Sequence, residues 1–169
     1  KISFSMTGVV LDQFEAWAPD VLETFQALAA SGSCEFLGET SHHSLTALFS
    51  PDEFREQVEL HRRRMVDLFG VEPTVFRNTE LIYSNEVGEL VAGLGKYRAQ
   101  LCEGVDRHLG DRSPNYLYKL PGSSSLKLLL KNYRLSDDIA FRFSDRNWSE
   151  WPLKAETFAK WVDRINGDG

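Results

Sequence analysis

The stretch Pro73-Thr74-Val75-Phe76-Arg77-Asn78-Thr79-Glu80 decides the fold that the sequence predicts. Its first five residues are rich in β-branched and aromatic side chains, which favours a strand over residues 74–77. Ser84 suits a helix N-cap, and the apolar residues after it recur at helical spacing as far as Gly95. Glu80 therefore stands between a strand and a helix, where α/β barrels carry catalytic groups. A salt-bridged structural acid is the alternative interpretation of Glu80.

The rest of the chain repeats this alternation of strand and helix. Further strands are expected over residues 2–7, 34–38, 98–103, 115–120 and 126–132, and further helices over 11–30, 51–69 and 154–165. The helix over 51–69 has the clearest boundaries, because Ser50-Pro51-Asp52-Glu53 reads as a capping box and Gly70 as a stop. Gly122-Ser123-Ser124-Ser125 reads as a turn or a partly disordered tip. This order predicts an α/β fold with a mainly parallel sheet, either a barrel or an open doubly wound sheet.

The composition excludes several classes of protein. The 169 residues are 42% hydrophobic and carry a net charge of −6, which suits one globular domain and argues against a nucleic-acid partner. No apolar run is long enough to span a membrane. No Gly-rich phosphate loop follows an expected strand, so no nucleotide cofactor is expected. Cys34 and Cys102 have no disulfide or metal spacing, and we expect two reduced core thiols, which fits a cytoplasmic protein. The oligomeric state is not predicted.

Polar residues gather after three of the expected strands. These segments cover residues 38–44, 78–80 and 103–107. Because the carboxyl ends of parallel strands lie at the same edge of a sheet, we expect the three segments to converge on one cleft.

Three further features each allow two interpretations. Adjacent histidines rarely bind the same ion, so no metal is expected at His42 and His43, and His43 either donates to a substrate or is structural. Asp137 and Asp138 are either a pair of acids or the start of a helix near Ile139. Trp148 either stacks on a sugar or packs in a core.

The polar segments belong to longer strings that resemble glycoside hydrolase family 57, in its α-amylase-like branch. The matching strings are Phe36-Leu37-Gly38-Glu39-Thr40 with His43-Ser44, Phe76-Arg77-Asn78-Thr79-Glu80-Leu81-Ile82-Tyr83, Glu103-Gly104-Val105-Asp106, Arg112-Ser113-Pro114-Asn115-Tyr116, and the run from Asn132 to Ser144. The resemblance extends over essentially the whole chain.

The resemblance implies a retaining enzyme that acts on an α-glucan or maltooligosaccharide without a metal or cofactor. Its catalytic domain would be an incomplete (β/α)7 TIM-like barrel with mainly parallel strands. The position of the family's nucleophile matches Glu80, and that of a sugar-contacting histidine matches His43. Ser41-His42 stands where this branch more often has two tyrosines, so the choice between His42 and His43 stays open. The expected substrate-binding residues are His43, His42, Glu39, Arg77, Asp106 and Trp148.

The resemblance also implies that residues 1–169 are the central portion of the catalytic barrel. The family's first strand, with a His-Gln-Pro motif, and the strand with its acid/base aspartate are expected outside this chain, which would leave the chain alone inactive. Three alternatives remain: an α-glucan transglycosylase, of the 4-α-glucanotransferase or branching type; a metal-dependent polysaccharide deacetylase; and a non-catalytic carbohydrate-binding scaffold.

Overall fold

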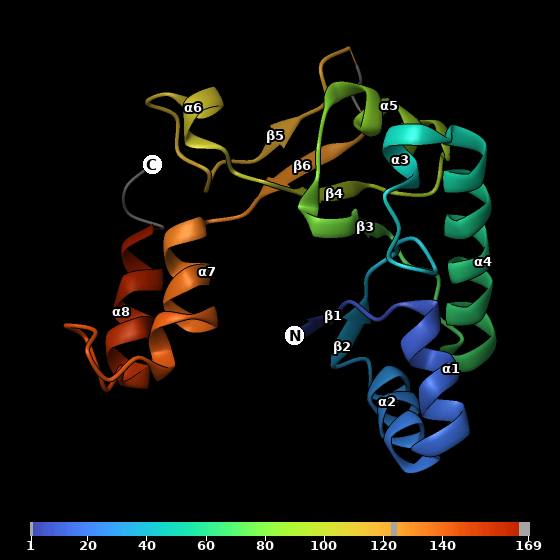
Figure 1. Cartoon of the computed structure of the whole chain (residues 1–169), viewed down its shortest axis with the longest axis horizontal. Coiled ribbons are helices and arrows are strands. Elements are labelled where there is room, and N and C mark those ends of the chain that lie inside the picture. The colour runs from blue at the N-terminus through green and yellow to red at the C-terminus, as the bar shows by residue number, and fades with distance from the viewer. Residues whose placement is uncertain (1, 123–124, 166–169) are drawn as a thin grey trace. The chain divides into compact units, whose positions relative to one another are not determined.

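The computed structural model describes residues 2–122 and 125–165, and in these ranges the chain has an α/β fold with mostly parallel strands (Figure 1). The chain divides into two compact units. The first comprises residues 1–103 and 118–128, and the second comprises residues 104–117 and 129–169. The expected loop at 122–125 lies partly outside the described residues, and the expected end of the last helix at 166–167 lies wholly outside them.

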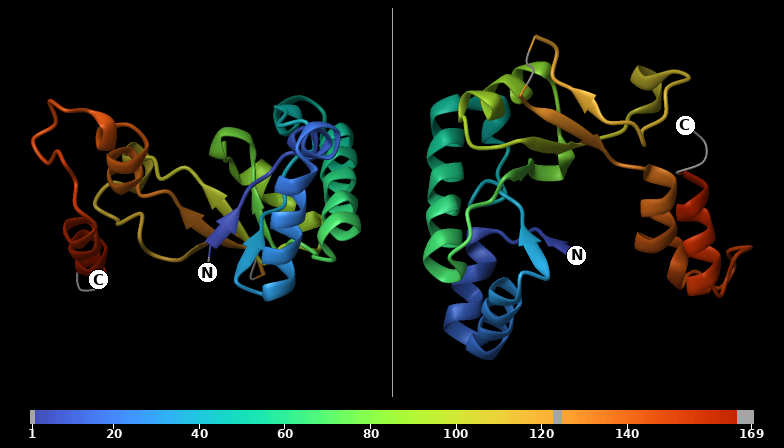
Figure 2. Two further views of the ribbon diagram at one scale, coloured as in Figure 1. Left: turned by 90° about the horizontal axis from the view of Figure 1, so that it is seen from below. Right: turned by 180° about the vertical axis from the view of Figure 1, so that it is seen from behind.

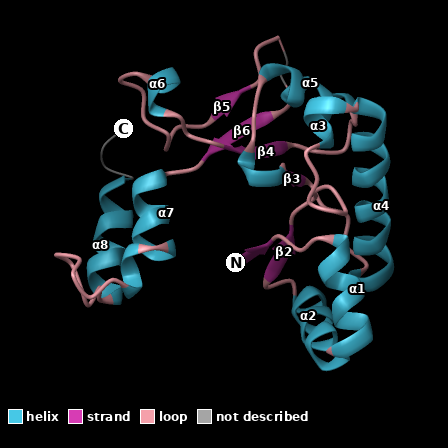
Figure 3. Cartoon of the chain, in the orientation of Figure 1, coloured by secondary structure: helices cyan, strands magenta, loops and turns pink. Residues whose placement is uncertain are grey.

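The strands of the first unit follow the predicted order, although they are shorter than predicted. They are β1 (Ile2–Phe4), β2 (Cys34–Phe36), β3 (Val75–Arg77), β4 (Ala99–Cys102), β5 (Tyr118–Lys119) and β6 (Lys127–Leu130), the last of which continues into the second unit. β1 pairs with β2 in parallel, and β3 pairs with β4 in parallel. The second sheet has the order β3-β4-β6-β5, and β5 is antiparallel to β6 (Figure 3).

Gly38 joins the two sheets. Its N–H donates to the carbonyl of Val75 at 2.8 Å, and its carbonyl accepts from the N–H of Arg77 at 2.8 Å, which makes a parallel bridge to Phe76. A Cβ atom at Gly38 would lie 2.5 Å from the Tyr97 ring, so only glycine fits this crossing without a shift. The strands β1, β2, β3 and β4 therefore lie side by side in chain order.

The helices of the first unit are α1 (Gly8–Trp17), α2 (Pro19–Ser31), α3 (Thr46–Phe49), α4 (Pro51–Phe69) and α5 (Asn85–Gly93), together with a 3₁₀ turn, η1 (Thr79–Leu81). The helical stretch predicted over residues 11–30 consists of two helices, the longer of which begins at Pro19. The Ser50 hydroxyl accepts from the N–H of Glu53 and caps α4 as predicted, and Gly70 ends that helix at a φ of 64°. Ser84 caps α5 in the same way through the N–H of Val87.

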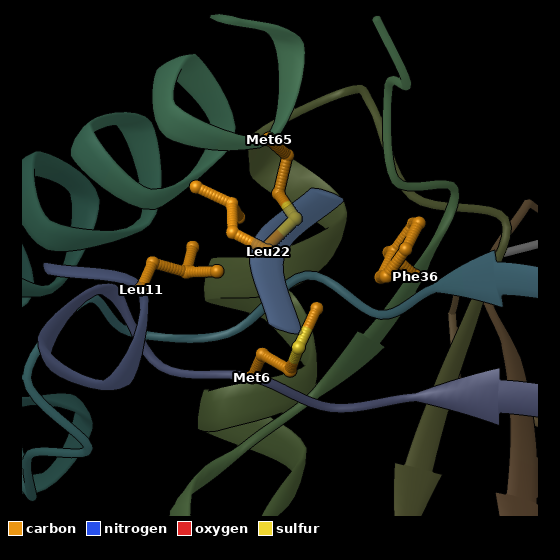
Figure 4. Close-up of a cluster of buried hydrophobic side chains, with 5 residues drawn as sticks. All are labelled: Met6, Leu11, Leu22, Phe36 and Met65. Atoms are coloured by element: carbon orange, nitrogen blue, oxygen red, sulfur yellow. The ribbon is translucent and has the colours of Figure 1, made fainter. Parts of the chain in front are cut away.

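The core of the first unit lies between β1 and β2 and the helices α1, α2 and α4, which gather on one side of these strands (Figure 2). Figure 4 shows the five side chains at its centre, which come from all of these helices, from β2 and from the segment after β1: Met6, Leu11, Leu22, Phe36 and Met65. Aromatic rings extend this cluster, and Phe36 stacks on Phe69 with 4.6 Å between the ring centroids. Burial of these side chains holds the strand ends in place.

The second unit contains α6 (Asp106–Leu109), α7 (Tyr133–Ala140), η2 (Arg142–Ser144) and α8 (Ala155–Ile165). The interpretation of Asp137 and Asp138 as the start of a helix near Ile139 was wrong. The Asn132 side chain accepts from the N–H of Leu135 and caps α7 there, so both acids lie inside the helix. Asp138 is buried and pairs with Arg142, whereas Asp137 lies 3.6 Å from the Lys131 amine.

Candidate active site

The carboxyl ends of β1, β2 and β3 place three short segments together in the first unit. Ser5 follows β1, Glu39 to Ser44 follow β2, and Asn78 to Leu81 follow β3. The parallel pairing of neighbouring strands explains this convergence, which the sequence predicted for the second and third of these segments.

Glu80 lies at an unusual point of the backbone. It is inside η1, with a φ of 53°, and Leu81 beside it has a φ of 57°. Left-handed backbone is unfavourable for a residue with a side chain, and such residues cluster at functional sites. Asn78 holds this turn, because its side-chain amide donates to the carbonyl of Ile82 at 2.9 Å. The Glu80 side chain is 72% exposed, so its carboxylate is accessible to a ligand.

His43 contacts Glu80 from the neighbouring strand end. Its Nε2 lies 3.1 Å from Glu80 Oε1. An ionised carboxylate can only accept, so Nε2 carries a proton in this contact. His43 has a left-handed φ of 51°, and its N–H donates to the carbonyl of Thr40. Two of the residues with left-handed backbone therefore meet through their side chains.

Glu39 lies on the other side of the same imidazole. Its Oε2 is 3.6 Å from His43 Nδ1, and its Oε1 accepts from the Ser5 hydroxyl at 2.6 Å. Glu39 is only 2% exposed. A buried carboxylate requires partners, and here a hydroxyl and an imidazole provide them.

Buried hydroxyl groups join the two loops behind these side chains. The Thr40 hydroxyl lies 3.3 Å from the Thr79 hydroxyl and accepts from the N–H of Ser44 at 3.0 Å. Thr40 is fully buried and Thr79 nearly so. Because hydrogen bonds between buried polar groups are costly to break, these contacts hold the backbone on both sides of the contact between His43 and Glu80.

His61 of α4 lies close to the same group. Its Nε2 donates to the carbonyl of Met6 at 2.8 Å, while its Nδ1 is buried and has no hydrogen-bond partner among the described residues. Burial lowers the pKa of His61, because the charged imidazole loses its hydration, although the Met6 carbonyl and the charge of Glu39 oppose this shift. The neutral imidazole is therefore the stable form.

Two of the other predicted residues lie near these segments without joining the contacts. Arg77 is half-buried, and in residues 2–122 and 125–165 its guanidinium makes no ion pair or hydrogen bond with Glu80. His42 is exposed, and no hydrogen bond joins its side chain to another residue in the described part of the chain.

Asp106 and Trp148 belong to the second unit, whereas Glu80 belongs to the first. Asp106 is exposed at the start of α6. Trp148 is half-buried and packs edge-on against Trp161, with 6.2 Å between the ring centroids. It also lines a pocket of about 700 Å³ with Arg142 of the same unit.

Sequence reasoning missed Ser5 and the pair of threonines. Ser5 was assigned to a strand, and Thr40 and Thr79 were given no role of their own. The strand-end argument that selected Glu39 applies equally to Ser5, because β1 is parallel to β2 and ends beside it.

Among the described residues, no three His, Cys, Asp or Glu side chains gather in a way that would hold a metal ion. None of the helices within residues 2–122 and 125–165 combines the length and the apolar character needed to cross a membrane.

Comparison with known proteins gives a consistent result. The sequence model of glycosyl hydrolase family 57 matches residues 1–168. A Methanocaldococcus jannaschii protein named "Putative alpha-amylase" is 46% identical over 169 residues, which is 99% of this chain and 36% of that protein. The chain thus spans about a third of the length of this curated relative.

Solved structures share the fold at low sequence identity. The 4-alpha-glucanotransferase from Thermococcus litoralis superposes with a TM-score of 0.72 and 17% identity, over 84% of this chain and 23% of that one. A "putative polysaccharide deacetylase" from Mycobacterium smegmatis superposes with a TM-score of 0.65 and 19% identity, over 98% of this chain and 53% of that one. These two structures support the α/β fold alone. The family match over nearly the whole chain and the 46% identity carry the assignment, and the chain belongs to glycosyl hydrolase family 57.

Proposed function

We propose that the protein containing this chain is a retaining α-glucan-active glycosidase, with Glu80 as its nucleophile. The observation that carries this proposal is the exposed Glu80 carboxylate at a strand end, on left-handed backbone and in contact with His43. Residues 1–169 would form the central part of an incomplete (β/α)7 barrel in that protein. Family membership and the named relative support the substrate class.

In the first step of such a reaction, a Glu80 oxygen attacks the anomeric carbon of the sugar, and the glycosidic C–O bond breaks. An acid/base carboxyl group gives a proton to the departing oxygen. In the second step that group removes a proton from water, the water oxygen attacks the anomeric carbon, and the ester bond to Glu80 breaks. Glu80 returns as a carboxylate.

His43 would orient the nucleophile. Its Nε2–H engages Oε1 of Glu80, and no hydrogen bond to Oε2 is present in the described part of the chain. Oε2 is therefore the oxygen that we assign to the attack on the sugar. Orientation of a nucleophile before the reaction removes part of the entropic barrier.

A transglycosylase is the second candidate. The M. jannaschii relative is named as an alpha-amylase, and the T. litoralis structure is a 4-alpha-glucanotransferase. Both activities would share the first step and differ in whether water or a sugar hydroxyl accepts the glycosyl group. Product analysis after incubation with maltooligosaccharides separates them, because transfer yields chains longer than the starting material.

The test is mass spectrometry of the full-length protein after incubation with 5-fluoro-α-glucosyl fluoride, which traps glycosyl-enzyme intermediates. We expect a covalent adduct on the peptide that contains Glu80. Glu80→Gln should abolish both the adduct and the hydrolysis of α-glucan, because an amide is a poor nucleophile.

Glu89→Gln is the matched control. Glu89 is also an exposed acid, on α5 close in sequence to Glu80, and it has no assigned role. It should keep both the adduct and the activity. An adduct on another carboxylate, or full activity in Glu80→Gln, would overturn the assignment.

A further inference from the structure

Glu39 is almost fully buried, and it lies beside His43, the residue that contacts the candidate nucleophile Glu80. Its side chain is 2% exposed, so it cannot face a bound sugar as the sequence analysis expected. It contacts only two side chains by polar atoms in the described residues: the Ser5 hydroxyl at 2.6 Å and His43 Nδ1 at 3.6 Å. A carboxylate placed in this way acts on the imidazole rather than on a substrate.

The imidazole of His43 stands between two carboxylates. Glu80 faces Nε2 and Glu39 faces Nδ1. Each carboxylate accepts only, so the ring satisfies both only when both nitrogens carry protons. A neutral ring protonated on Nε2 alone would present a lone pair to the buried Glu39.

We infer that Glu39 and Ser5 are positioning residues for His43. Ser5 fixes Oε1 of Glu39, the charge of Oε2 at 3.6 Å then favours a proton on His43 Nδ1, and the ring is held with Nε2–H toward Glu80. This inference rests on the proposed function of Glu80, because it gives the arrangement a catalytic purpose. The contacts run from Ser5, after β1, through Glu39 and His43, after β2, to Glu80, after β3.

The same two strands contain a matched control. The Ser3 hydroxyl donates to Glu35 at 2.6 Å, which makes a second serine–glutamate pair on β1 and β2, ahead of the pair of Ser5 and Glu39 that follows these strands. Ser3 and Glu35 are exposed and make no contact with His43. An effect that comes only from breaking a serine–glutamate hydrogen bond should therefore appear when either pair is changed. An effect on the His43 ring should appear only when Ser5 or Glu39 is changed.

The experiment is nitrogen-15 NMR of the histidine rings in the full-length protein, compared with Glu39→Gln, Ser5→Ala, Glu35→Gln and Ser3→Ala. In Glu39→Gln, Ser5 keeps the amide oxygen at the Oε1 position, so the amide NH₂ faces His43 Nδ1 and requires it to accept. We expect the Nδ1 signal of His43 to change from protonated to unprotonated. Ser5→Ala should give a partial change in the same direction, and both β1–β2 control variants should give none.

Kinetics give the second readout. Glu39→Gln should lower kcat by up to about 100-fold with little change in KM, because the group does not touch the sugar. An unchanged His43 signal in both Glu39→Gln and Ser5→Ala overturns the inference whatever the activity. The NMR readout does not require turnover, so it tests the role of Glu39 and Ser5 even if Glu80 is not the nucleophile. The trapping experiment tests the assignment of Glu80 separately.

Discussion

His43 Nε2 lies 3.1 Å from Glu80 Oε1, although 37 positions separate the two residues in the chain. His42, the adjacent residue, is exposed and makes no such contact in the described part of the chain. The contact with Glu80 therefore favours His43 over His42, a choice that the sequence left open.

The first prediction compares His43→Asn with His42→Asn. Asparagine tolerates the left-handed backbone that His43 adopts, so the substitution removes the imidazole at little conformational cost. We expect His43→Asn to lower kcat on α-glucan by about 100-fold, because Glu80 loses its orienting donor. His42→Asn should change kcat by less than about 3-fold. Equal losses in the two variants would contradict the role of His43.

The second prediction concerns pH and His61. Burial lowers the pKa of this imidazole in the folded state, so the unfolded state binds a proton more readily than the folded state. Stability from His61 is therefore complete above the unfolded pKa near 6.5 and is lost as the pH falls below it, by at most about 1.4 kcal/mol for each pH unit.

The measurement is urea unfolding of wild type and His61→Gln at about pH 7.5 and about pH 5.5, on either side of the unfolded pKa. Glutamine can still donate to the carbonyl of Met6 and does not titrate. The loss of unfolding free energy on acidification should be smaller in the variant. A loss of the same size in both proteins would show that other groups cause it.

Strand order and direction predicted that residues 38–44, 78–80 and 103–107 converge. The first two segments meet through Thr40–Thr79 and His43–Glu80. The third begins beside them, because the N–H of Glu103 donates to the carbonyl of Leu81 at 3.1 Å. The argument needs only the order and direction of the strands, which periodicity and capping signals indicate. Asp106, which was predicted to join these segments, belongs to the second unit, which the chain enters at Gly104.

Other features depend on single side chains that periodicity does not report. The left-handed turn at Glu80 contains no glycine, and the Asn78 side chain holds it through the carbonyl of Ile82. Similarly, α7 begins at Tyr133 because Asn132 caps it, whereas the sequence analysis expected a helix to start near Ile139. A side chain that bonds to nearby backbone competes with the regular pattern, so the sequence pattern alone predicted neither the turn at Glu80 nor the start of α7.

The third prediction concerns the two thiols. Cys102 has no exposed surface, and burial raises its pKa to about 12, so it has almost no thiolate at neutral pH. Cys34 is partly exposed. Iodoacetamide followed by peptide mapping should modify Cys34 and leave Cys102 unmodified in the native protein, while urea should expose both. Equal labelling rates in the native state would mean that β4 opens readily.

The fourth prediction uses a pair of glycines. A Cβ atom at Gly104 would lie 2.4 Å from the backbone carbonyl of Lys131, which cannot move without a shift of the segment between β6 and α7. Gly104→Ala should therefore lower the unfolding free energy by about 1–3 kcal/mol, the usual cost of overpacking. At Gly93, which ends α5, a Cβ would meet no atom within 4 Å, and Gly93→Ala should be neutral or stabilising by up to about 1 kcal/mol.

Thermal unfolding of both variants measures this contrast. Similar melting temperatures for the two would show that the backbone of Lys131 moves at little cost, and that the close approach of Gly104 does not hold the start of the second unit.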